Sequence, residues 1–143
     1  MKLFVATPIS TFTDPEAYNA YRKTVVQFVS ALRTEHEVSC DIDGLETKAQ
    51  YVSPEHAFHR DFSAISKCDA FILHYPAPTP TSALIELGYA IALNKPIIMI
   101  TPDRNKLPYL VQTLDEVENH YCIIESNELG VDTAKRIIEV LSK

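Results

Sequence analysis

Glycine is scarce in this sequence, with three residues in a chain of 143. This scarcity excludes the glycine-rich loops that hold phosphate groups. Neither a Walker A motif, nor Gly-x-Gly-x-x-Gly, nor the nucleophile elbow Gly-x-Ser-x-Gly occurs. Long apolar runs are also missing, because none reaches the roughly 18 residues that cross a bilayer. The short apolar run at the N-terminus does not have the length of a secretory signal. We therefore expect a cytoplasmic protein without a membrane partner.

Positive charge is sparse as well. Thirteen Lys and Arg residues stand against 19 Asp and Glu, which gives a net charge of −6, and the basic residues form no cluster. A polymer of nucleic acid is bound through a basic surface, so we expect no such partner. The three cysteines, Cys40, Cys68 and Cys122, lack the spacing of a metal site and are typical of small buried residues in a reducing compartment.

What the sequence does have is a regular alternation of apolar runs and amphipathic segments. Five runs predict strands, at residues 3–7, 36–42, 68–75, 96–101 and 121–124. Four segments predict helices. The first two open at Asp14-Pro15 and Ser53-Pro54, the third runs from about Thr81 to Asn94, and the last lies at the C-terminus. Between the last two strands, Leu110, Leu114 and Val117 recur at helical spacing.

Strands that alternate with helices and are apolar throughout predict a parallel sheet covered on both faces. We expect one domain over residues 1–143 with an α/β fold, a flavodoxin- or Rossmann-like three-layer sandwich whose five-stranded parallel sheet has the order 2-1-3-4-5. Ligands of such sheets bind at the carboxyl ends of the strands, where the order reverses between strands 1 and 3. The expected substrate-binding residues are Thr7, Pro8, Ile9, Ser10, Tyr75, Thr79, Thr81, Ser82 and Tyr89.

A single carboxylate interrupts the third predicted helix. Between His74 and Lys95, every side chain other than Glu86 is uncharged. Glu86 lies too far into the helix for a capping box. Its neighbours at helical spacing carry no charge that could pair with it; they are Ser82, Ala83, Tyr89 and Ala90. A buried carboxylate without a cationic partner is costly and is typical of a functional site. The alternative is a structural carboxylate on a solvated face.

Asp61, late in the second predicted helix, is a second candidate for the site. The alternative is a surface residue paired with a neighbouring Lys or Arg. His56 and His59 are spaced three apart and could bind a metal together with Asp61, but no third histidine lies on a neighbouring element. We therefore expect neither a metal nor a cofactor. Any anion would be bound by the N-terminus of the third helix and its hydroxyl groups.

The stretch from Asp61 to Ile100 resembles the nucleoside 2-deoxyribosyltransferase superfamily, which includes the deoxynucleoside 5′-monophosphate N-glycosidases. Its members have Asp-x-x-x-Ile-x-x-x-Asp, a strand, a loop, and then Glu-x-Gly-x-Ala-x-x-x-x-Lys-Pro before another strand. The residues that match this pattern are Asp61, Ile65, Asp69, Glu86, Gly88, Ala90, Lys95 and Pro96.

This resemblance implies an enzyme that cleaves or exchanges the N-glycosidic bond of a small nucleoside or nucleotide. Glu86 is then the nucleophile that attacks C1′ of the sugar, and Asp61 orients the sugar or protonates the departing base. Because sites in this family are often completed by a neighbouring subunit, the resemblance also implies a homodimer or a larger homo-oligomer. The segment from Arg104 to Tyr109 is the candidate contributor.

Two positions depart from the family pattern. Phe4 stands where the family often has a tyrosine that hydrogen-bonds the nucleophile, and Pro80 stands where transferases have an aspartate that reads the base. Two other functions therefore stay open. One is a Toll/interleukin-receptor (TIR)-like NAD glycohydrolase, which also uses a glutamate on a helix of a flavodoxin-like sheet. The other is a non-catalytic nucleotide-sensing domain, which the missing hydroxyl at Phe4 favours.

Overall fold

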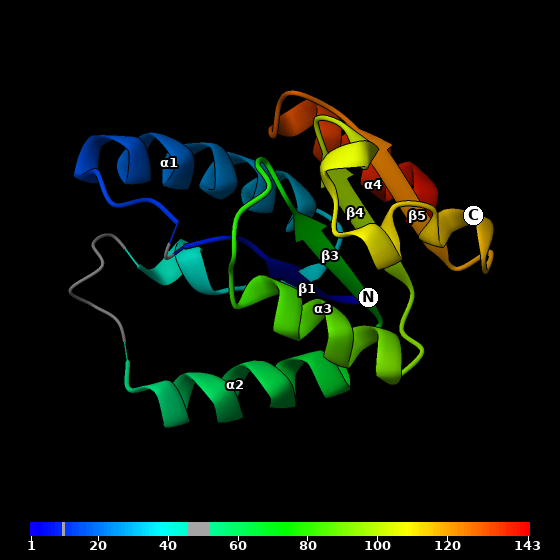
Figure 1. Cartoon of the computed structure of the whole chain (residues 1–143), viewed down its shortest axis with the longest axis horizontal. Helices are drawn as coiled ribbons and strands as arrows, with labels where there is room; N and C mark the ends of the chain where they lie inside the picture. The colour runs from blue at the N-terminus through cyan, green and yellow to red at the C-terminus, as the bar shows by residue number, and fades with distance from the viewer. Residues whose placement is uncertain (10, 46–51) are drawn as a thin grey trace.

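Five strands form one parallel sheet in the computed structural model, which describes residues 1–9, 11–45 and 52–143 (Figure 1). The strands are β1 (Lys2–Ala6), β2 (Glu37–Cys40), β3 (Ala70–His74), β4 (Ile97–Thr101) and β5 (Tyr121–Glu125). Their order is β2-β1-β3-β4-β5, and each neighbouring pair is parallel. The predicted sheet and its order are confirmed.

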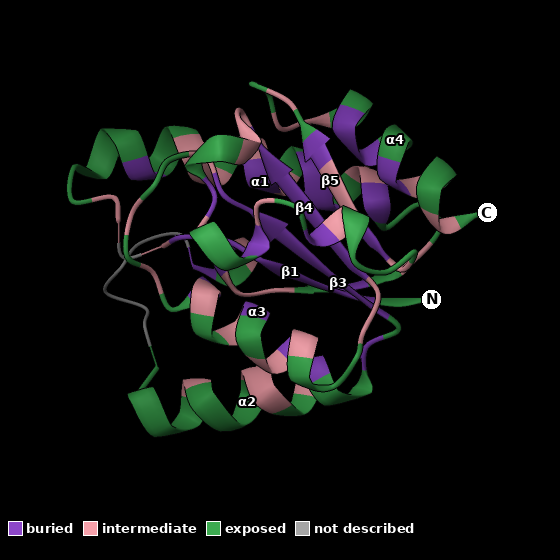
Figure 2. Ribbon diagram, turned by 45° about the vertical axis from the view of Figure 1, so that its right-hand side comes forward, coloured by how far each residue is buried: buried purple, intermediate pink, exposed green. Residues whose placement is uncertain are grey.

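Helices cover both faces of the sheet. α1 (Pro15–Leu32) and α4 (Val131–Leu141) lie together on one face, and α2 (Pro54–Lys67) and α3 (Ala83–Ala92) lie on the other (Figures 1 and 2). Side chains alternate along each strand, so Val5 packs in the cluster with α1 and α4 while Phe4 packs in the cluster with α2 and α3. The result is the predicted three-layer sandwich.

The helices that open with proline begin where the sequence predicted. Asp14 caps α1 by accepting a hydrogen bond from the Ala17 N–H (3.2 Å), and Ser53 caps α2 by accepting one from the His56 N–H (3.3 Å). Each proline occupies a first-turn position that needs no N–H donor. None of the helices in the described ranges combines the length and apolarity that a membrane span requires.

Three short 3₁₀ turns replace a regular helix between β4 and β5: η3 (Arg104–Lys106), η4 (Tyr109–Val111) and η5 (Leu114–Glu116). Leu114 is buried, but Leu110 and Val117, which share its helical spacing in the sequence, are 89% and 67% exposed. Pro108 has no N–H to donate and so separates η3 from η4. Thr113, with φ −125°, is not helical and separates η4 from η5, so Leu110, Leu114 and Val117 do not share one helical face.

Lys95 and Asp69, two residues that match the family pattern, make hydrogen bonds that stabilise the fold. The Lys95 ammonium donates to the carbonyl oxygens of Ser66 and Cys68 at the end of α2, both at 2.8 Å. Asp69 accepts a hydrogen bond from the Lys2 N–H at 2.6 Å, just before β3 begins. Both therefore have structural roles at the end of the sheet opposite the predicted crevice.

Candidate active site

A cavity of about 390 Å³ lies at the carboxyl ends of β1 and β2, between α2 and the first turn of α3. This volume falls within the roughly 300–1,000 Å³ of typical small-molecule sites. Most of its wall is apolar and includes Phe4, Ile9, Leu45, Phe58 and Phe62. The charged groups of the wall are concentrated on α2, on α3 and on the turn that follows β2.

The predicted site residues divide into those that line this cavity and those that do not. The lining includes Asp61, Glu86, Thr7, Ile9, Thr81 and Ser82. Pro8, Tyr75, Thr79 and Tyr89 lie outside the lining. Ser10 falls outside the residues that the structure describes.

Hydrogen bonds brace the loop that leads from β3 to α3. The Tyr75 hydroxyl donates to the carbonyl oxygen of Thr79 (3.2 Å), and the Thr79 hydroxyl contacts the Thr11 hydroxyl (3.3 Å). The Thr81 hydroxyl accepts a hydrogen bond from the first N–H of α3 (3.3 Å). Tyr75, Thr79 and Thr81 therefore stabilise the conformation of this loop, and the exposed Ser82 lines the cavity.

Glu86 sits in the first turn of α3 with its carboxylate at the cavity wall. Its Oε2 atom is buried and has no hydrogen-bond partner among the described residues. Burial raises the pKa of Glu86 to about 8, the negative charges of Asp61 and Asp41 add to the rise, and the Arg60 guanidinium opposes it. A buried carboxylate with a raised pKa at a cavity is typical of a functional site.

Arg60 and Asp41 complete the charged group around Glu86. The Arg60 guanidinium pairs with Asp61 (Nε to Oδ1, 3.0 Å) and with Asp41 (Nη2 to Oδ2, 3.1 Å). Carboxylate oxygens of Asp41, Asp61 and Glu86 lie within 4.8 Å of one another. Asp61 thus has a basic partner, as in the alternative reading of the sequence, and lies at the cavity as well. The sequence analysis missed both Asp41 and Arg60.

Three carboxylates at this spacing could also bind a divalent cation. Within the described ranges, Arg60 already supplies positive charge in contact with two of them. His56 and His59 do not belong to this group of carboxylates. Both line a second cavity, which extends along α2 as far as Lys67.

Phe4 lines the same cavity and is 1% exposed. Its ring stacks on Phe71, with centroids 5.8 Å apart and planes 9° from parallel. A phenyl ring cannot donate a hydrogen bond, so Phe4 offers no partner to the buried oxygen of Glu86 in the same cavity. Pro80 is exposed and does not line the cavity.

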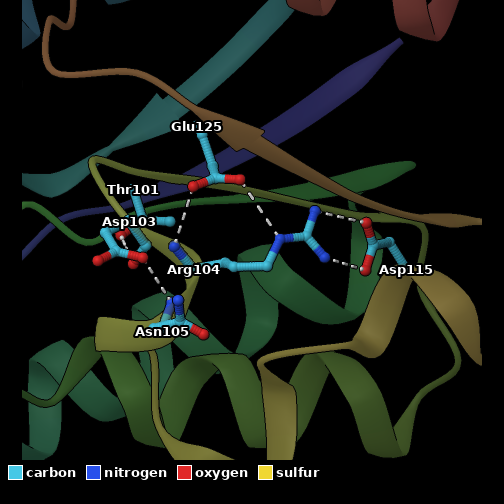
Figure 3. Close-up of polar contacts among 6 residues, drawn as sticks. All are labelled: Thr101, Asp103, Arg104, Asn105, Asp115 and Glu125. Carbon is cyan, nitrogen blue, oxygen red and sulfur yellow. Dashed lines mark hydrogen bonds and ion pairs between the residues drawn. The ribbon is translucent and has the colours of Figure 1, made fainter.

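The segment expected to reach a neighbouring subunit begins with an arginine that is bound within its own chain (Figure 3). The two Nη atoms of Arg104 donate to the two carboxylate oxygens of Asp115 (3.2 and 3.1 Å), and Nε donates to Glu125 (3.4 Å). Tyr109 and Leu110, in contrast, are 87% and 89% exposed. This region therefore offers a partner the exposed Asn105 and Lys106 as well as Tyr109 and Leu110.

Comparisons with known proteins agree with this architecture. The sequence model described as nucleoside 2-deoxyribosyltransferase matches residues 3–139. A solved structure from Clostridium botulinum, described as the CMP N-glycosidase BcmB, is 23% identical, covers 97% of this chain and 99% of its own, and superposes with a TM-score of 0.69. A conserved protein from Enterococcus faecalis V583 is 17% identical, with coverages of 97% and 98% and a TM-score of 0.61. Comparison with curated protein sequences gives no significant match.

Proposed function

Because the chain belongs to the nucleoside 2-deoxyribosyltransferase family, we propose that it cleaves the N-glycosidic bond of a nucleoside or nucleotide and passes the sugar to water or to an acceptor, with Glu86 as the nucleophile. One observation carries this proposal. Glu86 presents a carboxylate at the wall of a small-molecule cavity, with one buried oxygen that has no partner among the described residues. A carboxylate at the wall of a cavity that no hydrogen bond holds to the protein is a candidate nucleophile.

The chemistry is a double displacement. One oxygen of Glu86 attacks C1′, the C1′–N bond breaks, and the base leaves with a proton while the sugar stays bound as an ester of Glu86. Water or an acceptor then attacks C1′ and releases the Glu86 carboxylate. Asp61, at the same cavity, orients the sugar or supplies the proton for the base. The ionised form of Glu86 is required, so its raised pKa makes the reaction faster above neutral pH.

Cytidine monophosphate is the first substrate to test, because the solved structure from Clostridium botulinum is described as a CMP N-glycosidase. A phosphate group would be bound by the hydroxyls of Thr81 and Ser82 at the N-terminus of α3, where the helix dipole favours an anion.

A non-catalytic nucleotide sensor is the second candidate function. Phe4 favours it, since a phenyl ring at the cavity wall cannot orient the attacking carboxylate of Glu86. A sensor would bind the nucleotide and release no base. This difference makes the two candidates separable in one experiment.

The test is incubation with cytidine and deoxycytidine monophosphate, the free nucleosides and NAD, followed by chromatography of the released base. Release from a nucleotide or nucleoside supports the proposal, release from NAD alone supports a TIR-like glycohydrolase, and binding without release supports the sensor. Three variants accompany the wild type. Glu86→Gln should abolish release but still bind ligand in calorimetry, and Asp61→Asn should lower kcat about 10²–10⁴-fold with a smaller change in KM. Glu139→Gln, an exposed residue of α4, is the control. Undiminished turnover by Glu86→Gln refutes the nucleophile.

A further inference from the structure

Asp41 adds a third carboxylate to the cavity beside the two that the proposed function uses. It is the first residue of η1 (Asp41–Gly44), directly after β2, and its side chain is 23% exposed. Arg60 connects it to Asp61, because one guanidinium pairs with both carboxylates at 3.1 and 3.0 Å. The two aspartates are therefore held in a fixed relation although they come from different elements.

The charges of this group do not balance. Asp41, Asp61 and Glu86 place three carboxylates within 4.8 Å, and Arg60 contributes a single positive charge. Carboxylates this close in a partly buried site repel one another strongly when all are ionised, so such a group retains a proton near neutral pH. Burial raises the pKa of Asp41, and the hydrogen bond and negative charge of Asp61 raise it further, which makes Asp41 one of the places where that proton resides.

The other charged and titratable groups around Asp41 do not change this balance. Asp43 on the same turn pairs with Arg33 at 2.6 Å. Arg22 donates to backbone carbonyl oxygens of η1 rather than to the Asp41 carboxylate. Burial raises the pKa of the Cys40 thiol on β2 to about 12, so the thiol is neutral.

We propose that Asp41 is a positioning residue that shares one proton with Asp61, and that the pair delivers this proton to the departing base through Asp61. The inference rests on the proposed function. As the bond from Glu86 to C1′ forms and the C1′–N bond breaks, the proton passes to the base and leaves both aspartates ionised against Arg60. When water attacks C1′, the pair takes up one proton of that water, and Glu86 is released as a carboxylate. The cycle thus consumes one water and leaves no proton unassigned.

Kinetics of Asp41→Asn test the delivery of the proton. Asparagine keeps the shape of the side chain but cannot hold the shared proton. With cytidine monophosphate we expect kcat to fall about 10²-fold while KM changes less than about threefold, because the proton acts only in the transition state. Asp43→Asn, in the same turn but outside the cavity lining, is the matched control and should keep the wild-type kcat. Equal kcat values for the two variants overturn the inference.

Carbon-13 NMR of the aspartate carboxyl groups tests the sharing without any turnover. In the wild type, Asp41 should keep its proton well above the usual range of an aspartate, because burial and the neighbouring Asp61 raise its pKa. In Asp61→Asn, Asp41 should titrate in a single step at lower pH, because a neighbouring negative charge has been removed. If Asp61→Asn does not fold, Asp61→Ser replaces it in this titration, because serine also removes the negative charge. An unchanged titration of Asp41 overturns the shared proton. A wild type that releases no base from any substrate refutes the proposed function instead, and the titration still decides whether the proton is shared.

Discussion

Replacing Glu86 with glutamine removes one negative charge from the cavity and keeps the size of the side chain. The rise in the pKa of Glu86 from 4.5 to about 8 corresponds to about 5 kcal/mol of unfavourable free energy for the ionised form, since a tenfold change in proton affinity is about 1.4 kcal/mol. This is an upper bound, because water in the cavity and side-chain movement relieve part of the cost. Domains of this size have a net stability of roughly 5–15 kcal/mol, so the effect is measurable.

The stability difference between Glu86→Gln and the wild type should depend on pH in one direction. Between about pH 4.5 and 8 the folded wild type keeps the proton of Glu86 while the unfolded chain loses it. The wild type therefore loses stability at this position as the pH rises, whereas a glutamine does not titrate. We expect almost no difference below pH 4.5, a growing advantage for the variant through neutral pH, and a plateau above pH 8.

Urea unfolding at a series of pH values from 4 to about 9 measures this course. Glu139→Gln, which removes an exposed carboxylate from α4, should show a small difference that does not vary in this way. Wild-type kcat/KM should pass through a maximum between about pH 7 and 8, because Glu86 must be ionised while the proton that Asp41 shares with Asp61 must still be present. A difference that is flat with pH, or a glutamine variant that is less stable at pH 9, refutes the view that Glu86 is an unpaired buried carboxylate.

Three further outcomes are expected. Lys95→Met leaves two backbone carbonyls at the end of α2 without their donor and should cost about 1–3 kcal/mol in urea unfolding; a loss below about 0.5 kcal/mol would assign those carbonyls to solvent. Gly88→Ala should gain about 0.5–1 kcal/mol, since an added Cβ meets no atom within 4 Å, and a loss would point to a steric demand at this position. Sedimentation should give a homodimer or larger, and Leu110→Lys, which charges an 89% exposed leucine, should shift it toward the monomer. A wild type that is strictly monomeric and active contradicts this prediction.

The sheet and its order could be predicted because they follow from the chain itself. The runs at residues 3–7 and 96–101 are apolar at nearly every position. This pattern is typical of strands in a parallel sheet that helices cover on both faces. The starts of α1 and α2 could be predicted from local sequence. The N–H groups of a first helical turn have no acceptor within the helix, so a capping side chain followed by proline, which has no N–H, is favoured there. The segment after β4 was harder to predict, because Leu110, Leu114 and Val117 recur at helical spacing although this part of the chain forms separate 3₁₀ turns.

The charged group of the site could be predicted only in part. Glu86 was visible because it is the one charge in a long uncharged stretch of sequence. Asp41 and Arg60 gave no such signal, since aspartate after a strand and arginine on a helix surface are ordinary. Their partnership depends on the placement of α2 across the end of β2, a contact between residues far apart in the sequence.

One rule of the fold nevertheless points to Asp41 once the sheet order is known. Carboxyl ends of parallel strands meet at one edge, so a residue that directly follows β2 reaches the same edge as the residues that follow β1. Applied to this sequence, the rule selects the residues just after Cys40, and the first acid among them is Asp41. The same rule separates Asp61 from Asp69. Asp61 lies in the part of α2 that borders the cavity, whereas Asp69 precedes β3 and therefore lies at the opposite edge, where it binds the backbone of Lys2. Motif matches alone cannot make this distinction, because both residues belong to the same family pattern.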